Sequence, residues 1–120
     1  MQLTQPDQAQ QQAVFRAVSD PTRRSILVQL SEEDMTIGDI VEQYSVTRTA
    51  IKKHLTILEE GGLISVRKIG RERLNSLEPL GLKRIDNWLR HFHEFWEERL
   101  NKLKEVVEAE EKARPERKSK

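Results

Sequence analysis

Residues 47–60, "TRTAIKKHLTILEE", constrain the fold more than any other stretch of the chain. Their apolar residues recur at intervals of three, four and seven, which places them on one face of an α-helix. That face consists of Ala50, Ile51, Leu55 and Leu58. Thr47 can cap the start of the helix, and two glycines follow its end. Because the opposite face is basic, we expect the helix to pack its apolar face inward and to present the basic face to a partner.

The segments on either side of this helix define its setting. The preceding "TIGDIVEQY" predicts a short helix in which Thr36 and Asp39 have the spacing of a capping box, and the brief turn "SV" follows it. Residues 63–68 and 72–77 predict two strands joined by a turn at Gly70. Helix, tight turn, helix and hairpin in this order predict a winged helix-turn-helix.

Three further helices complete the predicted fold. One begins near Ala9, and a second starts at Pro21, with Asp20 as its cap and a buried face of Ile26, Leu27 and Leu30. From Pro79 onward a single long helix is expected. The predicted fold class is therefore mainly α with a small β-hairpin, with about five helices and a two-stranded wing. Its predicted parts are a flexible N-terminus (1–8), the winged helix-turn-helix domain with a long C-terminal dimerisation helix (9–108), and a charged flexible tail (109–120).

The distribution of charge indicates the kind of partner. The 120 residues carry a net charge of only +1, but residues 48–73 contain seven Lys and Arg against three Asp and Glu. Phosphates respond to such local clustering of positive charge. We therefore expect double-stranded DNA as the partner.

Separate roles follow from side-chain chemistry on the basic helix. An α-helix fits the major groove of B-DNA, where the forked guanidinium of Arg48 suits a guanine edge and Thr49 suits a thymine methyl group or a phosphate. Lys52 and Lys53 can reach bases or backbone. For Thr47 and Thr56 we expect capping and phosphate contacts.

Other basic residues extend this prediction. The hairpin carries four of them around its glycine turn, and such a wing tip suits a phosphate strand or the adjacent minor groove. They are Arg67, Lys68, Arg71 and Arg73. For Arg23 and Arg24 two interpretations stay open: each holds a phosphate, or each is ordinary surface.

The C-terminal helix predicts a homodimer. Its apolar residues follow alternating four- and three-residue steps, which is the 3.5-residue repeat of a helix that packs along another helix. The expected dimer contacts are Phe15, Ile85, Trp88, Leu89, Phe92, Phe95, Trp96 and Leu103. A ligand pocket is the less favoured interpretation of the aromatic residues.

Catalysis and cofactor binding have little support. The chain has no cysteine, which excludes a thiolate metal site, and it contains no nucleophile motif, Gly-rich phosphate loop or metal-ligand cluster. We interpret His54 as a packed or capping residue. His93 and Glu97 have i, i+4 spacing, but a shared metal site across a dimer is the less favoured interpretation. We expect no enzyme, metal or cofactor and no membrane segment, and we expect a cytoplasmic location.

Three strings of the sequence carry a family resemblance: "DPTRRSIL", "KKHLTILEEGGLI" and "FWEERL". With their surroundings, about residues 12–105, they resemble the ArsR family of bacterial winged-helix repressors, and more narrowly its metal-independent branch. The resemblance implies a homodimer formed by the first and last helices. This dimer would bind an imperfect palindrome in a promoter and repress transcription, including transcription of its own gene. Residues 47–56 correspond to the recognition helix and residues 67–73 to the wing. The cysteine pair and the Asp/His pattern of the metal-sensing members have no counterpart here.

Two alternatives remain open at this point. A winged helix can bind another protein through the same basic face, and a member of this fold can respond to a ligand or metal through the aromatic and histidine residues at 88–97. The effector, if there is one, is unknown.

Overall fold

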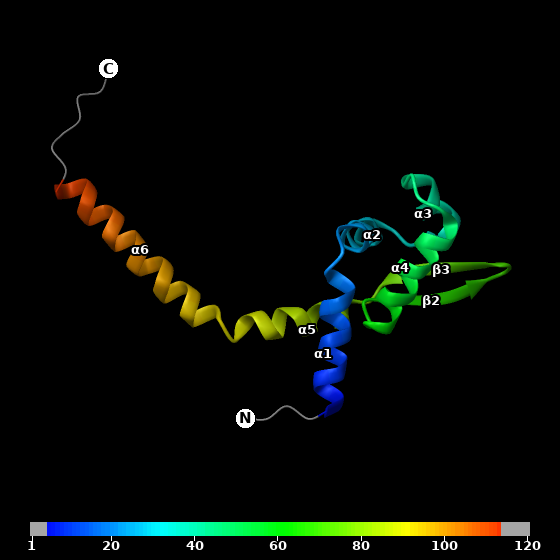
Figure 1. Ribbon diagram of the computed structural model, residues 1–120, viewed down its shortest axis with the longest axis horizontal. Helices are drawn as coiled ribbons and strands as arrows, with labels where there is room; N and C mark the ends of the chain where they lie inside the picture. Colours follow the sequence, from blue (N-terminus) through cyan, green and yellow to red (C-terminus); the bar gives the residue numbers. More distant parts are fainter. Residues whose placement is uncertain (1–4, 114–120) are drawn as a thin grey trace, which may run out of the picture. The chain divides into compact units, whose positions relative to one another are not determined.

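The computed structural model describes residues 5–113, which form six helices and three strands (Figure 1). Between Asp86 and Asn87 the chain divides into two units. The elements, in chain order, are α1 (Gln5–Val18), α2 (Pro21–Glu32), β1 (Met35–Thr36), α3 (Ile37–Gln43), α4 (Arg48–Glu60), β2 (Ile64–Ile69), β3 (Glu72–Leu77), α5 (Pro79–Arg90) and α6 (His93–Ala113).

The predicted helix starts are confirmed where a local cap determines them. Asp20 Oδ2 accepts from the backbone N–H of Arg23, with Pro21 as the first residue of α2. Thr36 and Asp39 form the predicted capping box at the start of α3. A side chain and a backbone N–H three residues apart need no other part of the chain, so these starts are readable from the sequence.

The N-terminal helix differs from its prediction. α1 begins at Gln5, four residues before the expected start near Ala9. Part of the predicted flexible segment, residues 5–8, therefore belongs to α1, and residues 1–4 lie outside the described residues. At the other end, α6 includes residues 109–113 of the predicted tail, and the remainder also lies outside that range.

The hairpin is confirmed, but the sheet has three strands where two were predicted. β2 and β3 pair in antiparallel register from Ile64 opposite Leu77 to Ile69 opposite Glu72. The two residues of β1 pair with the outer edge of β3, so the strand order is β1-β3-β2. Buried Asn75 strengthens this edge, because its Nδ2 donates to the carbonyl oxygen of Met35 over 3.2 Å. A two-residue strand has no alternating pattern of its own, which is why the sequence did not reveal it.

One core joins the helices and the sheet of the first unit. The predicted apolar faces of α2 and α4 both contribute to it, since Ile26, Ile51 and Leu58 are fully buried. The other buried apolar residues are Val14, Ala17, Leu27, Leu30, Met35, Ile40, Leu55, Leu63 and Ile64. Because α3, α4 and β2 pack together, the helix-turn-helix and the wing lie side by side in the first unit (Figure 1).

The prediction of one long C-terminal helix is wrong. α5 ends at Arg90 and α6 begins at His93. At the break, the N–H groups of His91 and Phe92 donate to carbonyls three residues earlier, Trp88 and Leu89. This tight i to i+3 pattern ends α5. The interruption contains neither proline nor glycine, so the sequence carries no signal for it.

No described helix is long and apolar enough to cross a membrane.

Candidate nucleic-acid interface

The orientation of α4 follows from its two faces. Ile51, Leu55 and Leu58 are buried in the core, and the Thr47 side chain caps the helix by accepting from the N–H of Ala50 over 3.1 Å. All six residues predicted to bind DNA on this helix and at its N-cap are exposed: Thr47, Arg48, Thr49, Lys52, Lys53 and Thr56. The apolar face thus holds α4 in one rotational setting, with its basic face in solvent.

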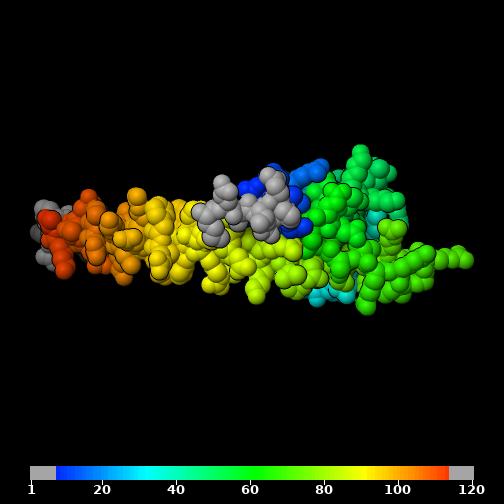
Figure 2. Space-filling view, turned by 90° about the horizontal axis from the view of Figure 1, so that it is seen from below, coloured from blue at the N-terminus to red at the C-terminus, as the bar shows by residue number. Residues whose placement is uncertain are grey.

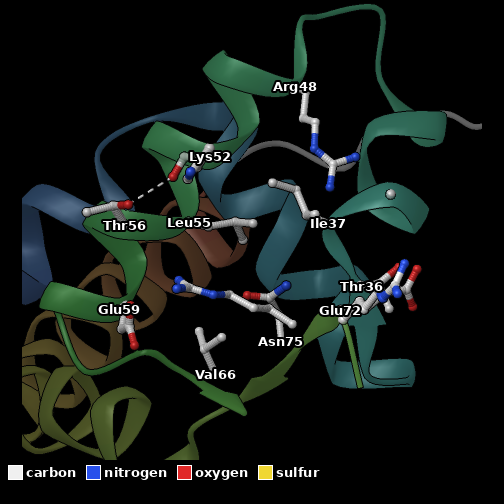
Figure 3. A pocket seen from close by; sticks show the side chains of 13 residues that line it. Thr36, Ile37, Arg48, Lys52, Leu55, Thr56, Glu59, Val66, Glu72 and Asn75 are labelled. Atoms are coloured by element: carbon white, nitrogen blue, oxygen red, sulfur yellow. Dashed lines mark hydrogen bonds between the residues drawn. The ribbon is translucent and has the colours of Figure 1, made fainter. Parts of the chain in front are cut away.

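A hollow of about 330 Å³ lies between α4, the start of α3 and the wing (Figure 3). Arg48, Lys52 and Thr56 line it from α4, and their side chains lie along one strip because they recur every four residues. Thr56 Oγ1 donates to the carbonyl of Lys52 over 3.0 Å, which leaves its lone pairs available to a donor. Arg71 and Arg73 line the opposite wall.

The electrostatics of this hollow favour an anion. Four cations line it, Arg48, Lys52, Arg71 and Arg73, against the two carboxylates Glu59 and Glu72. Within residues 5–113, none of the four cations forms an ion pair. Their excess positive charge is therefore available to a partner.

The rest of the wing is less uniform. The hairpin tip projects beyond the helices of the first unit (Figures 1 and 2), and residues 67–73 are all exposed. Gly70 turns the tip at a φ of 61°, a conformation that favours glycine. Arg67 lies 3.9 Å from Asp34, so part of its charge is balanced within the chain. Lys68 has no ion pair in the described part of the chain.

Neither open interpretation fits Arg23, because its side chain is buried. Its Nε donates to the carbonyl of Ala17 over 2.8 Å, and Nη1 lies 3.1 Å from Nδ1 of His54. His54 is therefore a packed residue, as expected. The N–H of Arg23, which donates to Asp20, holds the pKa of that carboxyl below its ordinary value, with smaller contributions from the charges of His54 and Arg23. Arg24 is exposed and donates to the carbonyl of Val18.

The structure also brings a basic residue, Arg16, beside α4, which the sequence did not indicate. Arg16, near the end of α1, lines a second hollow together with residues from the exposed side of α4. No sequence signal indicated this, because Arg16 precedes α4 by about thirty residues and lies in a segment, 1–47, with seven acidic and three basic residues. The packing of α1 against α4 brings it there.

None of the three histidines joins a larger cluster of metal-ligating side chains within the described residues. Among residues 5–113, no group of three or more His, Cys, Asp or Glu side chains is arranged to hold a metal ion. His93 Nε2 lies 3.4 Å from Glu97 Oε1, and both side chains are exposed. The aromatic residues of this region contact one another edge to face, Trp88 with Phe92 and Phe95 with Trp96, at centroid distances of 5.0 and 5.8 Å.

The predicted dimer residues form two groups by exposure. Phe15, Ile85 and Trp88 are half-buried. The exposed ones are Leu89, Phe92, Phe95, Trp96 and Leu103, and α6 adds Leu100, Val106 and Val107. Trp96 and Leu103 are 57% and 59% exposed, unusual values for such large apolar side chains in one helix.

Comparisons with known proteins show which regulators this chain is similar to. The family model described as "Bacterial regulatory protein, arsR family" matches residues 20–66, the segment from the start of α2 into β2. The chain is 42% identical over 79 residues to the transcriptional repressor SdpR of Bacillus subtilis (strain 168), covering 66% of this chain and 88% of that protein. It is 30% identical over 105 residues to the HTH-type transcriptional regulator Rv2034 of Mycobacterium tuberculosis, covering 88% and 91%.

A solved structure extends the similarity to three dimensions. An ArsR-like transcriptional regulator from Rhodococcus sp. RHA1 superimposes with a TM-score of 0.70 at 32% sequence identity. The match covers 89% of this chain and 98% of the other. The similarity therefore includes the helix-turn-helix and the wing.

Proposed function

The chain belongs to the arsR family of bacterial regulatory proteins and is a DNA-binding transcriptional regulator, not an enzyme, and from this premise we propose that it acts as a dimeric repressor at an imperfect palindrome in a promoter. The observation that carries the proposal is the exposed basic face of α4, held rigidly beside a hollow with more cations than carboxylates. Repression is proposed because the similar Bacillus protein is named a repressor.

In this proposal α4 enters the major groove with its N-terminal half. Arg48 and Lys52 line the hollow beside the wing and read base edges, with Arg48 suited to a guanine. Thr49 and Lys53 lie on the neighbouring strip of the helix and line the second hollow together with Arg16. Arg71 and Arg73 hold the phosphate strand on the wing side, where Lys68 lies opposite Arg73 and Arg67 is one position closer to the base of the hairpin.

The dimer is proposed from the apolar surface of the C-terminal helices. An apolar row that includes Trp96, Leu100 and Leu103 is exposed along α6, and such a row is stabilised when a second helix covers it. A second copy is the natural partner, because most homo-oligomers are two-fold symmetric. A two-fold symmetric pair of reading helices then matches an inverted repeat in DNA. The proposed location is the cytoplasm, where bacterial DNA is accessible.

The experiment is a gel-shift titration against the promoter region upstream of the chain's own gene. Arg48→Ala and Lys52→Ala should each reduce the affinity for the specific site by about five- to 150-fold, the range of 1–3 kcal/mol for one base contact. Both residues are exposed, so thermal unfolding should be unchanged. The control is Lys83→Ala, which removes an exposed cation outside both hollows. Normal affinity in both variants would show that α4 is not the reading helix.

A second measurement distinguishes DNA from a protein partner. Binding to DNA releases counterions, so the logarithm of the association constant falls linearly with the logarithm of salt concentration, by about 0.9 for each phosphate contact. A wild-type affinity that does not change between 50 and 200 mM salt would contradict DNA binding through this face.

A further inference from the structure

The exposed side of α4 has a second hollow, on the side away from the wing. It has a volume of about 440 Å³ and lies where α1 packs against α4. Its lining residues are Arg16, Thr49, Lys52, Lys53, Thr56 and Ile57. Three of these are cations and none is a carboxylate, so this hollow is more uniformly positive than the one beside the wing.

The side chain of Arg16 is available to a partner, although its backbone is fixed. Its carbonyl accepts from Ser19 Oγ over 2.8 Å and from Arg23 Nη2 over 3.1 Å. Within residues 5–113, its guanidinium forms neither a hydrogen bond nor an ion pair, and the residue is exposed. A cation on an anchored turn with no internal partner is suited to an external anion.

The two hollows have Lys52 and Thr56 in common. These residues are one helical turn apart on the same strip of α4, so that strip forms a ridge with a hollow on each side. Beyond one hollow lie Arg71 and Arg73 of the wing, and beyond the other lies Arg16 of α1.

This arrangement of cations on both sides of α4 matches the geometry of B-DNA. The major groove is about 12 Å wide and is bordered by a sugar–phosphate strand on each side, so a helix within it has a strand on both flanks. We propose that Arg16 binds a backbone phosphate of the strand opposite the one held by the wing, so that α4 is clamped between cations on both sides. This inference depends on the proposed function, and it adds α1 to the DNA-binding surface.

The test is a salt titration of DNA binding, followed by fluorescence anisotropy, with Arg16→Ala, Arg16→Lys and the control Lys83→Ala. Loss of one phosphate contact lowers the salt slope by about 0.9. The affinity ratio of wild type to Arg16→Ala should therefore fall by about 3.5-fold between 50 and 200 mM salt. The loss of affinity should be equal on the specific site and on an unrelated duplex, because a phosphate carries no sequence information.

The other variants make the result decisive. Arg16→Lys retains the charge and should keep the wild-type slope, and Lys83→Ala should keep both slope and affinity. Arg16→Gln has a neutral side chain of similar length and should behave like Arg16→Ala. If Arg16→Ala unfolds at a lower temperature than wild type, Arg16→Gln takes its place in the comparison. A wild-type slope in both neutral variants overturns the inference while the proposed function stands. If wild type itself binds DNA without salt dependence, the proposed function fails instead.

Discussion

Arg23 Nη1 and His54 Nδ1 lie 3.1 Å apart, which joins the start of α2 to the middle of α4. The guanidinium also donates to the carbonyls of Ala17 and Arg16 at the end of α1. One buried side chain therefore fixes three helices together, and the basic face of α4 is positioned partly through it.

Arg23→Lys should destabilise the fold, although it preserves the charge. An ammonium on a flexible stem cannot reproduce the planar fork that reaches Ala17, Arg16 and His54 at once. We expect the free energy of unfolding in urea to fall by about 2–3 kcal/mol, the value of one or two lost hydrogen bonds from a charged group. Arg24→Lys is the matched control, since Arg24 is exposed, and it should change stability by less than about 0.5 kcal/mol. Equal stability of the two variants would contradict this role for Arg23.

Asp20 should make stability depend on acid pH. In the folded chain its pKa lies below the ordinary value of 3.8, chiefly because its carboxylate accepts the hydrogen bond from the N–H of Arg23. A lowered pKa means that the carboxylate stabilises the fold fully above its unfolded pKa, and that this contribution is lost as pH falls through the folded pKa. Asp20→Asn keeps an acceptor for the cap but cannot titrate. Its unfolding free energy should therefore decline less steeply than that of wild type below about pH 4.

The size of the cap contribution is measured separately at neutral pH. Asp20→Ala removes the acceptor and should lower the free energy of unfolding by about 1 kcal/mol, whereas Asp20→Asn should remain close to wild type. An identical pH profile for wild type and Asp20→Asn would show that this carboxyl does not contribute to the acid dependence.

Two glycines in helices should respond to alanine with opposite signs. A Cβ on Gly81, in the first turn of α5, would overlap the carbonyl oxygen of Gly62, so Gly81→Ala should destabilise by about 1–3 kcal/mol. A Cβ on Gly38, in α3, would meet nothing closer than 3.8 Å, at Thr36 Oγ1. Gly38→Ala should therefore raise the melting temperature, because alanine is favoured over glycine in a helix by up to about 1 kcal/mol. Melting curves that shift in the same direction for both would contradict the close approach at Gly81.

Trp96→Ala should weaken the proposed dimer. Its side chain is among the largest exposed apolar groups of α6, and buried Trp residues often dominate association energy. We expect the dimer dissociation constant in sedimentation equilibrium to rise at least about tenfold, which corresponds to 1.4 kcal/mol. Glu98→Ala, a change at an exposed polar position of the same helix, is the control. A wild-type chain that sediments as a monomer at all concentrations would rule out the dimer.

Much of the reading helix and wing was predictable because its determinants are local. Thr47 caps a helix through an amide three residues away, and Ile51, Leu55 and Leu58 select the buried face by their spacing alone. Gly70 marks the hairpin turn because the chain there has a positive φ. Each of these signals lies within one or two turns of the residue that it determines, so no knowledge of the remaining chain was needed.

Contacts between distant segments were decided only by the tertiary structure. The strand at Met35 forms because Asn75 lies opposite it, forty residues later in the chain. Arg23 looked like surface or a phosphate ligand, but the end of α1 and His54 surround it with acceptors. Arg16 reaches the side of α4 through the packing of α1, from a segment whose net charge is negative. The sequence by itself determined which residues of α4 face outward, since helical spacing and capping are local properties. What stands beside that face was decided by packing, because burial and long-range hydrogen bonds depend on residues that are adjacent only after the chain has folded.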